Sequence, residues 1–178
     1  MAHAITLLLD EASEADVRSL WSALDEAGVP SLARHGHGRH RPHLTLVVFD
    51  EGDPEAVAAG AVEARIGPST MDVRYAGHGV FSATRCVVHL AVTTSPALRS
   101  AHAAMVDVLA RAGATCWPHY EPARWLPHVT LAMDVLPAQA GAASALLAAR
   151  PLPSEGRAVR LALVHVESGE TRELARLA

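Results

Sequence analysis

Two five-residue stretches dominate this sequence: PHLTL at residues 42–46 and PHVTL at residues 127–131. In a β-strand, alternate side chains point to the same face. The histidine and threonine of each stretch therefore share one face, and the apolar residues anchor the other face in a core. A chance repeat of this pattern in one short chain would be rare, so the two stretches predict one site built from two similar halves.

The sequence around these stretches is also repeated. Each stretch follows a predicted strand, a predicted helix and a long loop. The first copy has its strand at residues 4–9 and its helix at 14–27, with Ser13 as the expected N-cap. The second copy has its strand at 86–92 and a helix that opens at Ser95 or Pro96.

The remaining segments complete the same doubling. We expect helices at 55–66 and 138–149, and strands at 71–75, 157–166 and 171–177. The predicted fold class is α+β, with two pseudo-symmetric lobes, each a mainly antiparallel sheet with covering helices, and an active-site cleft between them. The chain is predicted to be a single bilobal domain, with lobe one at about 1–83 and lobe two at about 84–178.

Composition excludes several classes of protein. All 15 basic residues are arginine, so a phosphate-binding P-loop and Schiff-base chemistry, which both need a lysine, are excluded. Cys86 and Cys116 form no paired motif, so no disulfide framework is expected. No signal peptide or membrane-spanning run is recognised, and we expect a cytoplasmic protein without a membrane partner, a cofactor or an obligatory protein partner.

The net charge is −4, but residues 27–49 contain no acidic residue. A loop rich in arginine and histidine at 35–41 precedes the first motif, and Arg41 is a candidate to bind an anionic substrate. A solvated loop without fixed contacts is the alternative. Zinc binding by His35, His37 and His40 would make the protein a metal-dependent hydrolase, although two glycines argue against the rigidity that such a site needs. We therefore expect no functional metal.

The paired His-x-Thr-x strands resemble the 2H phosphoesterase superfamily, and within it the group of 2'-5' RNA ligases and 2',3'-cyclic phosphodiesterases. The likeness covers nearly the whole chain. It implies that His43 and His128 are the catalytic pair and that Thr45 and Thr130 bind the phosphate. In that group an arginine commonly closes the second motif strand, where this chain has Ala132-Met133. The substrate therefore stays open among a 2',3'-cyclic nucleotide, an RNA end and a cyclic phosphate on another sugar nucleotide.

Histidine suits the chemistry that this resemblance implies. Opening a cyclic phosphodiester removes a proton from water and delivers one to the leaving oxygen, and a side chain with a pKa of about 6.5 can do either. By resemblance, His128 activates water and His43 protonates the 3'-oxygen, which leaves a 2'-phosphate. The resemblance leaves open whether the protein also ligates RNA through a 2'-5' bond in the reverse reaction.

Aromatic residues gather just before the second motif. Tyr120 and Trp125 could stack on a base and Arg124 could touch a phosphate; packing of the loop on itself is the alternative. We thus expect a metal-independent cyclic phosphodiesterase that acts on cyclic nucleotides or RNA ends. A nucleotide or RNA end-binding module without turnover is the alternative from another class.

Overall fold

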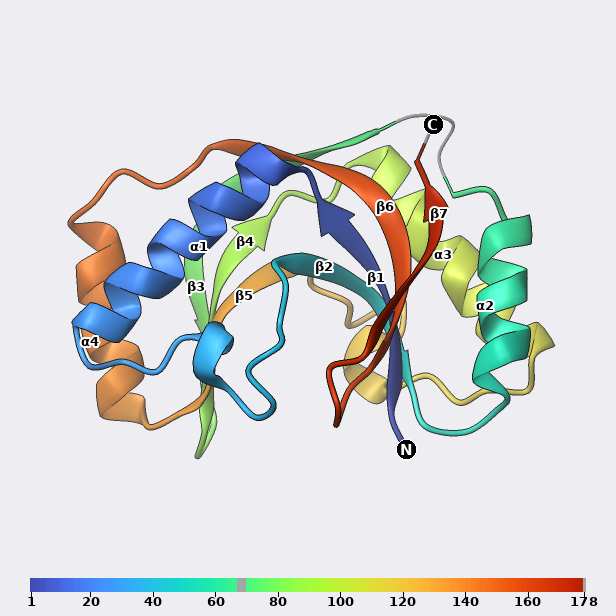
Figure 1. The fold of residues 1–178 in the computed structure, drawn as a ribbon, viewed down its shortest axis with the longest axis horizontal. Coiled ribbons are helices and arrows are strands. Elements are labelled where there is room, and N and C mark those ends of the chain that lie inside the picture. Colours follow the sequence, from blue (N-terminus) through green and yellow to red (C-terminus); the bar gives the residue numbers. More distant parts are fainter. Residues whose placement is uncertain (67–69, 178) are drawn as a thin grey trace.

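The computed structural model describes residues 1–66 and 70–177 of the chain (Figure 1). Its strands are β1 (His3–Leu9), β2 (His43–Phe49), β3 (Met71–Phe81), β4 (Cys86–Val92), β5 (His128–Val135), β6 (Glu155–His165) and β7 (Thr171–Arg176). Its helices are α1 (Glu11–Glu26), α2 (Pro54–Glu63), α3 (Pro96–Arg111) and α4 (Pro137–Ala148), with short 3-10 turns η1 (Leu32–Arg34) and η2 (Pro118–Tyr120).

The strands form one antiparallel sheet, which confirms the predicted α+β class. Their order is β1-β2-β5-β4-β3-β6-β7, and β6 also pairs with β1. The first six strands therefore make a ring of pairings, with β7 added beside β6. β3 pairs with β4, and β6 pairs with β1, so each half of the chain contributes strands next to those of the other half.

The helices cover one face of this sheet. α4 packs on β3 and β4, and α1 packs on β5 and β6, whereas α3 packs on β2 and α2 on β7 (Figure 1). Helix residues such as Trp21 and Leu98 share one hydrophobic core with Leu44 and Leu46 of β2 and Val129 of β5. The apolar residues of both motifs are thus buried under helices, and the alternate residues point to the face without helices.

Most predicted elements are confirmed, and two need correction. The N-cap of α1 is Asp10, whose carboxylate accepts a hydrogen bond of 2.9 Å from the Ser13 backbone N–H. Ser13 instead lies inside the helix and its hydroxyl accepts a bond from the Arg157 backbone N–H on β6. β3 also runs on past Tyr75 to Phe81, because residues 78–81 pair with β4.

The lobe boundary predicted near residue 83 falls in the turn between β3 and β4. The division of a single domain into two lobes stays a prediction. Within the described residues, no helix combines the length and the apolar composition needed to cross a membrane.

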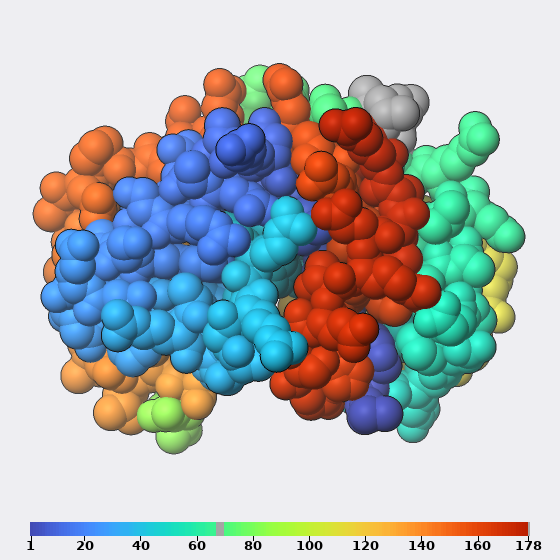
Figure 2. Space-filling model, viewed as in Figure 1, coloured from blue at the N-terminus to red at the C-terminus, as the bar shows by residue number. Residues whose placement is uncertain are grey.

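The histidine-rich loop lies against the β6–β7 hairpin. Figure 2 shows this loop (cyan) beside the hairpin (red) on one surface of the molecule. The His37 ring packs on Gly169, at the turn of that hairpin, so closely that a Cβ at this glycine would overlap it. The loop that leads into β2 is therefore in contact with the β6–β7 hairpin.

Candidate functional site

The two motifs meet in the sheet. β2 and β5 are antiparallel, and Leu44 lies directly opposite Val129. In such a pairing His43 falls opposite Thr130, and Thr45 falls opposite His128. Leu44 and Val129 point into the core, so the other four side chains lie together on the face without helices. The structure thus brings together the four principal residues that the sequence singled out.

Both motif histidines are oriented by a backbone carbonyl two residues earlier. Nδ1 of His43 lies 2.6 Å from the Arg41 oxygen, and Nδ1 of His128 lies 2.7 Å from the Leu126 oxygen. A carbonyl only accepts hydrogen bonds, so each Nδ1 carries the proton. Each Nε2 is therefore the atom that can accept or deliver a proton at the site.

Burial changes the acidity of both histidines. It lowers the pKa of His43 and of His128 below the usual 6.5, because a buried imidazolium loses hydration. The hydrogen bonds to the Arg41 and Leu126 carbonyls act in the opposite direction. A charge on His43 lowers the pKa of His128 further, so the two imidazoles are close enough for one to disfavour a proton on the other.

Sequence reasoning missed two residues beside His128. The ring of His89 on β4 lies 5.2 Å from the His128 ring, and the Phe81 ring lies 4.9 Å from it. Phe81 and His89 stack on each other at 4.0 Å. Burial lowers the pKa of His89 to about 4, so the ring is neutral near pH 7. The alternation of Cys86, Val88, Leu90 and Val92 was the available signal, because it turns His89 to the site face.

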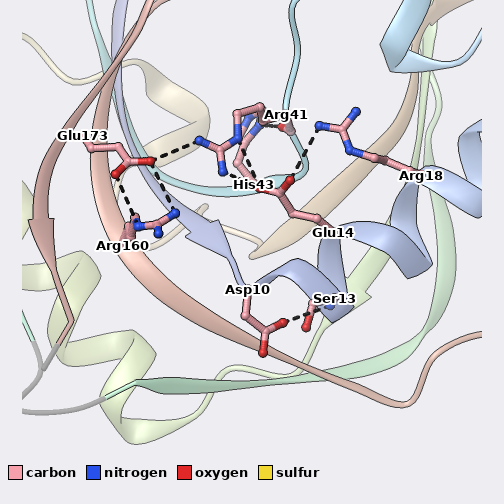
Figure 3. A network of polar contacts seen from close by, with 8 residues as sticks. All are labelled: Asp10, Ser13, Glu14, Arg18, Arg41, His43, Arg160 and Glu173. Carbon is pink, nitrogen blue, oxygen red and sulfur yellow. Dashed lines mark hydrogen bonds and ion pairs between the residues drawn. The ribbon is translucent and has the colours of Figure 1, made fainter.

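Arg41 takes part in an ion-pair network at the edge of the site (Figure 3). Its Nη2 lies 2.7 Å from Glu14 Oε1, and its Nη1 lies 3.2 Å from Glu173 Oε1. Glu173 also pairs with Arg160 of β6 at 3.3 Å. The guanidinium of Arg41 is therefore held by two carboxylates, while its backbone oxygen orients His43.

The aromatic segment before β5 packs on the first motif. Trp125 is buried, and its indole Nε1 donates a 3.1 Å hydrogen bond to the Thr45 carbonyl. Its ring stacks on His102 at 4.0 Å. Burial raises the pKa of the Tyr120 phenol to about 12, and a side-chain hydrogen bond with Thr45 opposes this shift. Arg124 is exposed and pairs with Glu121 at 3.9 Å.

The histidines of the preceding loop also cluster. The rings of His37 and His40 are 4.1 Å apart, and those of His35 and His40 are 6.0 Å apart. Even so, across residues 1–66 and 70–177 no three side chains of His, Cys, Asp or Glu are arranged to hold a metal ion.

Solved structures share this fold. LigT of E. coli in its apo form has a TM-score of 0.63 at 21% identity, over 98% of this chain and 95% of that one. LigT complexed with 3'-AMP has a TM-score of 0.60 at 21% identity, with the same coverage of 98% and 95%. The PDE domain of MHV ns2 has a TM-score of 0.52 at 21% identity, over 75% of this chain and 83% of that one. No curated protein matches the chain.

These similarities define the class: an α+β protein with the LigT-like fold. The family model of the 2'-5' RNA ligase superfamily matches residues 9–170. The chain therefore belongs to this superfamily of 2H phosphoesterases. Membership supports an enzyme of the phosphoesterase class.

Proposed function

We propose that the protein is a metal-independent phosphodiesterase that opens 2',3'-cyclic phosphates of nucleotides or RNA ends to 2'-phosphates. The observation that carries this proposal is the pairing of Leu44 with Val129, which turns two histidine–threonine pairs to one face of the sheet. A structural neighbour, LigT, has been solved with 3'-AMP, a nucleotide with a phosphate on its ribose, and this supports the substrate class.

The proposed reaction needs one neutral and one protonated histidine. His128 Nε2 removes a proton from water as the water oxygen bonds to phosphorus. The bond from phosphorus to the 3'-oxygen breaks, and His43 Nε2 gives its proton to that oxygen. The 2'-phosphate leaves, and exchange with solvent returns His43 to its protonated form and His128 to its neutral form. The mutual repulsion of two imidazolium charges favours the state with one protonated and one neutral histidine. Which histidine is the acid and which is the base follows from the family resemblance alone.

The threonines stabilise the charge that develops on phosphate. As water adds, negative charge grows on the two nonbridging oxygens, and hydroxyl donors fixed beside them lower the barrier. Thr45 lies opposite His128 and Thr130 lies opposite His43, so each hydroxyl neighbours the imidazole of the other motif. The reacting phosphate would thus be bound on the site face, over the paired strands β2 and β5.

The test is turnover of 2',3'-cyclic nucleotides in EDTA, with 2'- and 3'-phosphate products separated by chromatography. His43→Ala and His128→Ala should each lower kcat by about 10²- to 10⁴-fold, the usual contribution of one acid or base. His78→Ala is the matched control, since His78 lies on β3 but bonds Ser144 of α4, away from the site face.

A 3'-phosphate product would reverse the assigned positions of acid and base. Full activity in either motif variant would refute the two-histidine mechanism. Tight nucleotide binding without turnover by the wild-type protein would instead indicate a binding module.

A further inference from the structure

A row of paired residues runs across the site face from His43 to the edge of the sheet. Leu8 of β1 lies opposite His43 on one side and opposite Arg160 of β6 on the other. Arg160 in turn lies opposite Arg176 of β7. Directly paired residues point to the same face, so both arginines share the face of His43. With strands about 4.8 Å apart, they start about 10 Å and about 14 Å from His43 along the sheet.

A β-bulge places these charges together. Glu173 pairs with Ala162 and Ala175 pairs with Leu161, so Leu174 is an extra residue in β7. Without it, Glu173 and Arg176 would point to opposite faces, because they are three positions apart. The bulge therefore turns both side chains toward the site face.

The arginines are not balanced by the acidic groups around them. Like charges directly opposite each other destabilise a sheet. Glu173 compensates Arg160 at 3.3 Å and is shared with Arg41, as Figure 3 shows. Arg176 forms no ion pair within the described residues. One positive charge is therefore left uncompensated at the paired positions of Arg160 and Arg176.

These side chains line a shallow groove. Its volume is about 270 Å³, and its lining residues are Arg160, Glu173, Leu174, Ala175 and Arg176. Glu173 is the carboxylate of the groove, and Arg41 and Arg160 already neutralise it. An oxyanion in the groove would therefore meet an excess of positive charge. The planar guanidinium of arginine has hydrogen-bond donors arranged to suit the oxygens of a phosphate.

We propose that Arg160 and Arg176 bind a backbone phosphodiester of single-stranded RNA, next to the terminal cyclic phosphate at His43 and His128. This inference rests on the proposed function and narrows its substrate. The preferred substrate is an RNA that continues beyond its cyclic end, since a mononucleotide has no second phosphate for the groove. Arg176 supplies the main contact, and Arg160 is held in place by Glu173.

The experiment compares kcat/KM for a 2',3'-cyclic mononucleotide and for a trinucleotide RNA with the same cyclic end. The wild type should prefer the RNA. Arg176→Gln should lower the ratio of the two values by about fivefold, the scale of one exposed ion pair. The slope of log kcat/KM for the RNA against log salt should become shallower by about 0.7, as expected for one lost phosphate contact.

The matched control is Arg172→Gln. Arg172 lies on the same strand but pairs with Glu55 of α2, and its variant should keep the wild-type ratio and salt slope. An unchanged ratio in Arg176→Gln would overturn the inference, as would an equal loss in both variants.

Absence of turnover with both substrates would defeat the proposed function, not the groove. In that case fluorescence anisotropy measures the affinity of each variant for a labelled RNA that ends in a 3'-phosphate, and this tests the groove without turnover. Weaker binding by Arg176→Gln than by Arg172→Gln supports the groove, and equal binding refutes it.

Discussion

The indole Nε1 of Trp21 donates a 3.1 Å hydrogen bond to the backbone carbonyl of Thr130. Trp125 makes the equivalent bond, also of 3.1 Å, to the carbonyl of Thr45. Each motif strand is therefore fixed at its threonine by a buried tryptophan, although one tryptophan lies on α1 and the other in the loop before β5. The internal symmetry of the site thus includes the two tryptophan hydrogen bonds that hold the motif strands.

Trp21→Phe should destabilise the protein. The substitution leaves the Thr130 carbonyl without its indole donor in the core, which costs about 2 kcal/mol of the free energy of unfolding. Urea unfolding followed by far-UV circular dichroism measures this change. A urea midpoint equal to that of the wild type would show that the bond contributes nothing.

The motif threonines should act on the rate and not on the fold. In the proposed mechanism Thr45→Val and Thr130→Val each remove one donor to the developing phosphate charge, so each should lower kcat by about 10²- to 10³-fold. Steady-state kinetics with a cyclic nucleotide measures this loss.

Thr6 provides the control for those two variants. It lies opposite Thr45 on the site face, but its hydroxyl is fully buried and has no hydrogen-bond partner within the described residues. Thr6→Val should keep kcat and raise the free energy of unfolding by about 1 kcal/mol, because an unpaired buried hydroxyl is unfavourable. Loss of activity in Thr6→Val would assign this hydroxyl to the site.

Much of this arrangement could be predicted from the sequence. The two motifs predicted the strands β2 and β5 and showed which four side chains share one face. This was possible because the alternation of side chains along a strand is a local property of the sequence. The N-cap of α1 could not be chosen this way, since Asp10 and Ser13 are both good caps and the choice depends on the bond from Arg157 on distant β6.

The length of β3 and the role of His89 also needed the tertiary structure. Residues 76–81 include Gly77 and Gly79, which disfavour a strand on local grounds. Pairing with β4 extends the strand, and Gly79 leaves room for the His89 ring, which a Cβ there would meet at 2.7 Å. The sequence alone therefore hid the end of β3. Alternation along β4 could place His89 on the site face, but only the pairing of His89 with Thr130 shows that it lies beside the second motif.

The activity should have a bell-shaped pH dependence on the acid side of neutrality. Burial lowers the pKa of both His43 and His128 from 6.5. The proposed reaction needs one of the two protonated and the other neutral. We expect kcat/KM to reach its maximum below pH 6.5. Rates at constant ionic strength, measured from about pH 4 to about pH 8, test this expectation. A maximum on the alkaline side of neutrality would contradict it.

Buried His89 should make stability depend on pH. Its pKa is 6.5 in the unfolded chain and about 4 in the folded protein, so the unfolded chain binds the proton more tightly. Stability is full above pH 6.5 and is lost as the pH falls toward 4. The loss is on the order of 2 kcal/mol by about pH 4.5. His89→Phe keeps an aromatic ring against Phe81 and should remove this loss of the free energy of unfolding. Urea unfolding at pH 6.5 and at about pH 4.5 measures it.

The corresponding control is His119→Gln, at an exposed position in η2. It should show the same loss of stability with pH as the wild type. An equally steep loss in His89→Phe would mean that His89 is not the group responsible.

Glu14 positions His43 through Arg41. The Glu14 carboxylate binds both Nε and Nη2 of Arg41, at 3.2 and 2.7 Å, and the Arg41 carbonyl holds His43 Nδ1. Glu14→Gln removes the charge of the Glu14–Arg41 ion pair, so Arg41 and with it His43 should be held less firmly. We expect kcat to fall by roughly tenfold, because small displacements of a catalytic acid lower the rate. KM should stay close to its wild-type value, since Glu14 reaches the site only through Arg41.

The pH profile separates positioning from a general loss of stability. The bond to the Arg41 carbonyl raises the pKa of His43, so a weaker bond lowers that pKa further. In the proposed mechanism His43 must be protonated to act as the acid. The alkaline limb of kcat/KM should therefore move to lower pH in Glu14→Gln. Glu26→Gln, an exposed carboxylate at the other end of α1, should leave the limb in place. A tenfold loss in Glu14→Gln with an unmoved limb would show that the Glu14–Arg41 ion pair stabilises the fold without setting the acidity of His43.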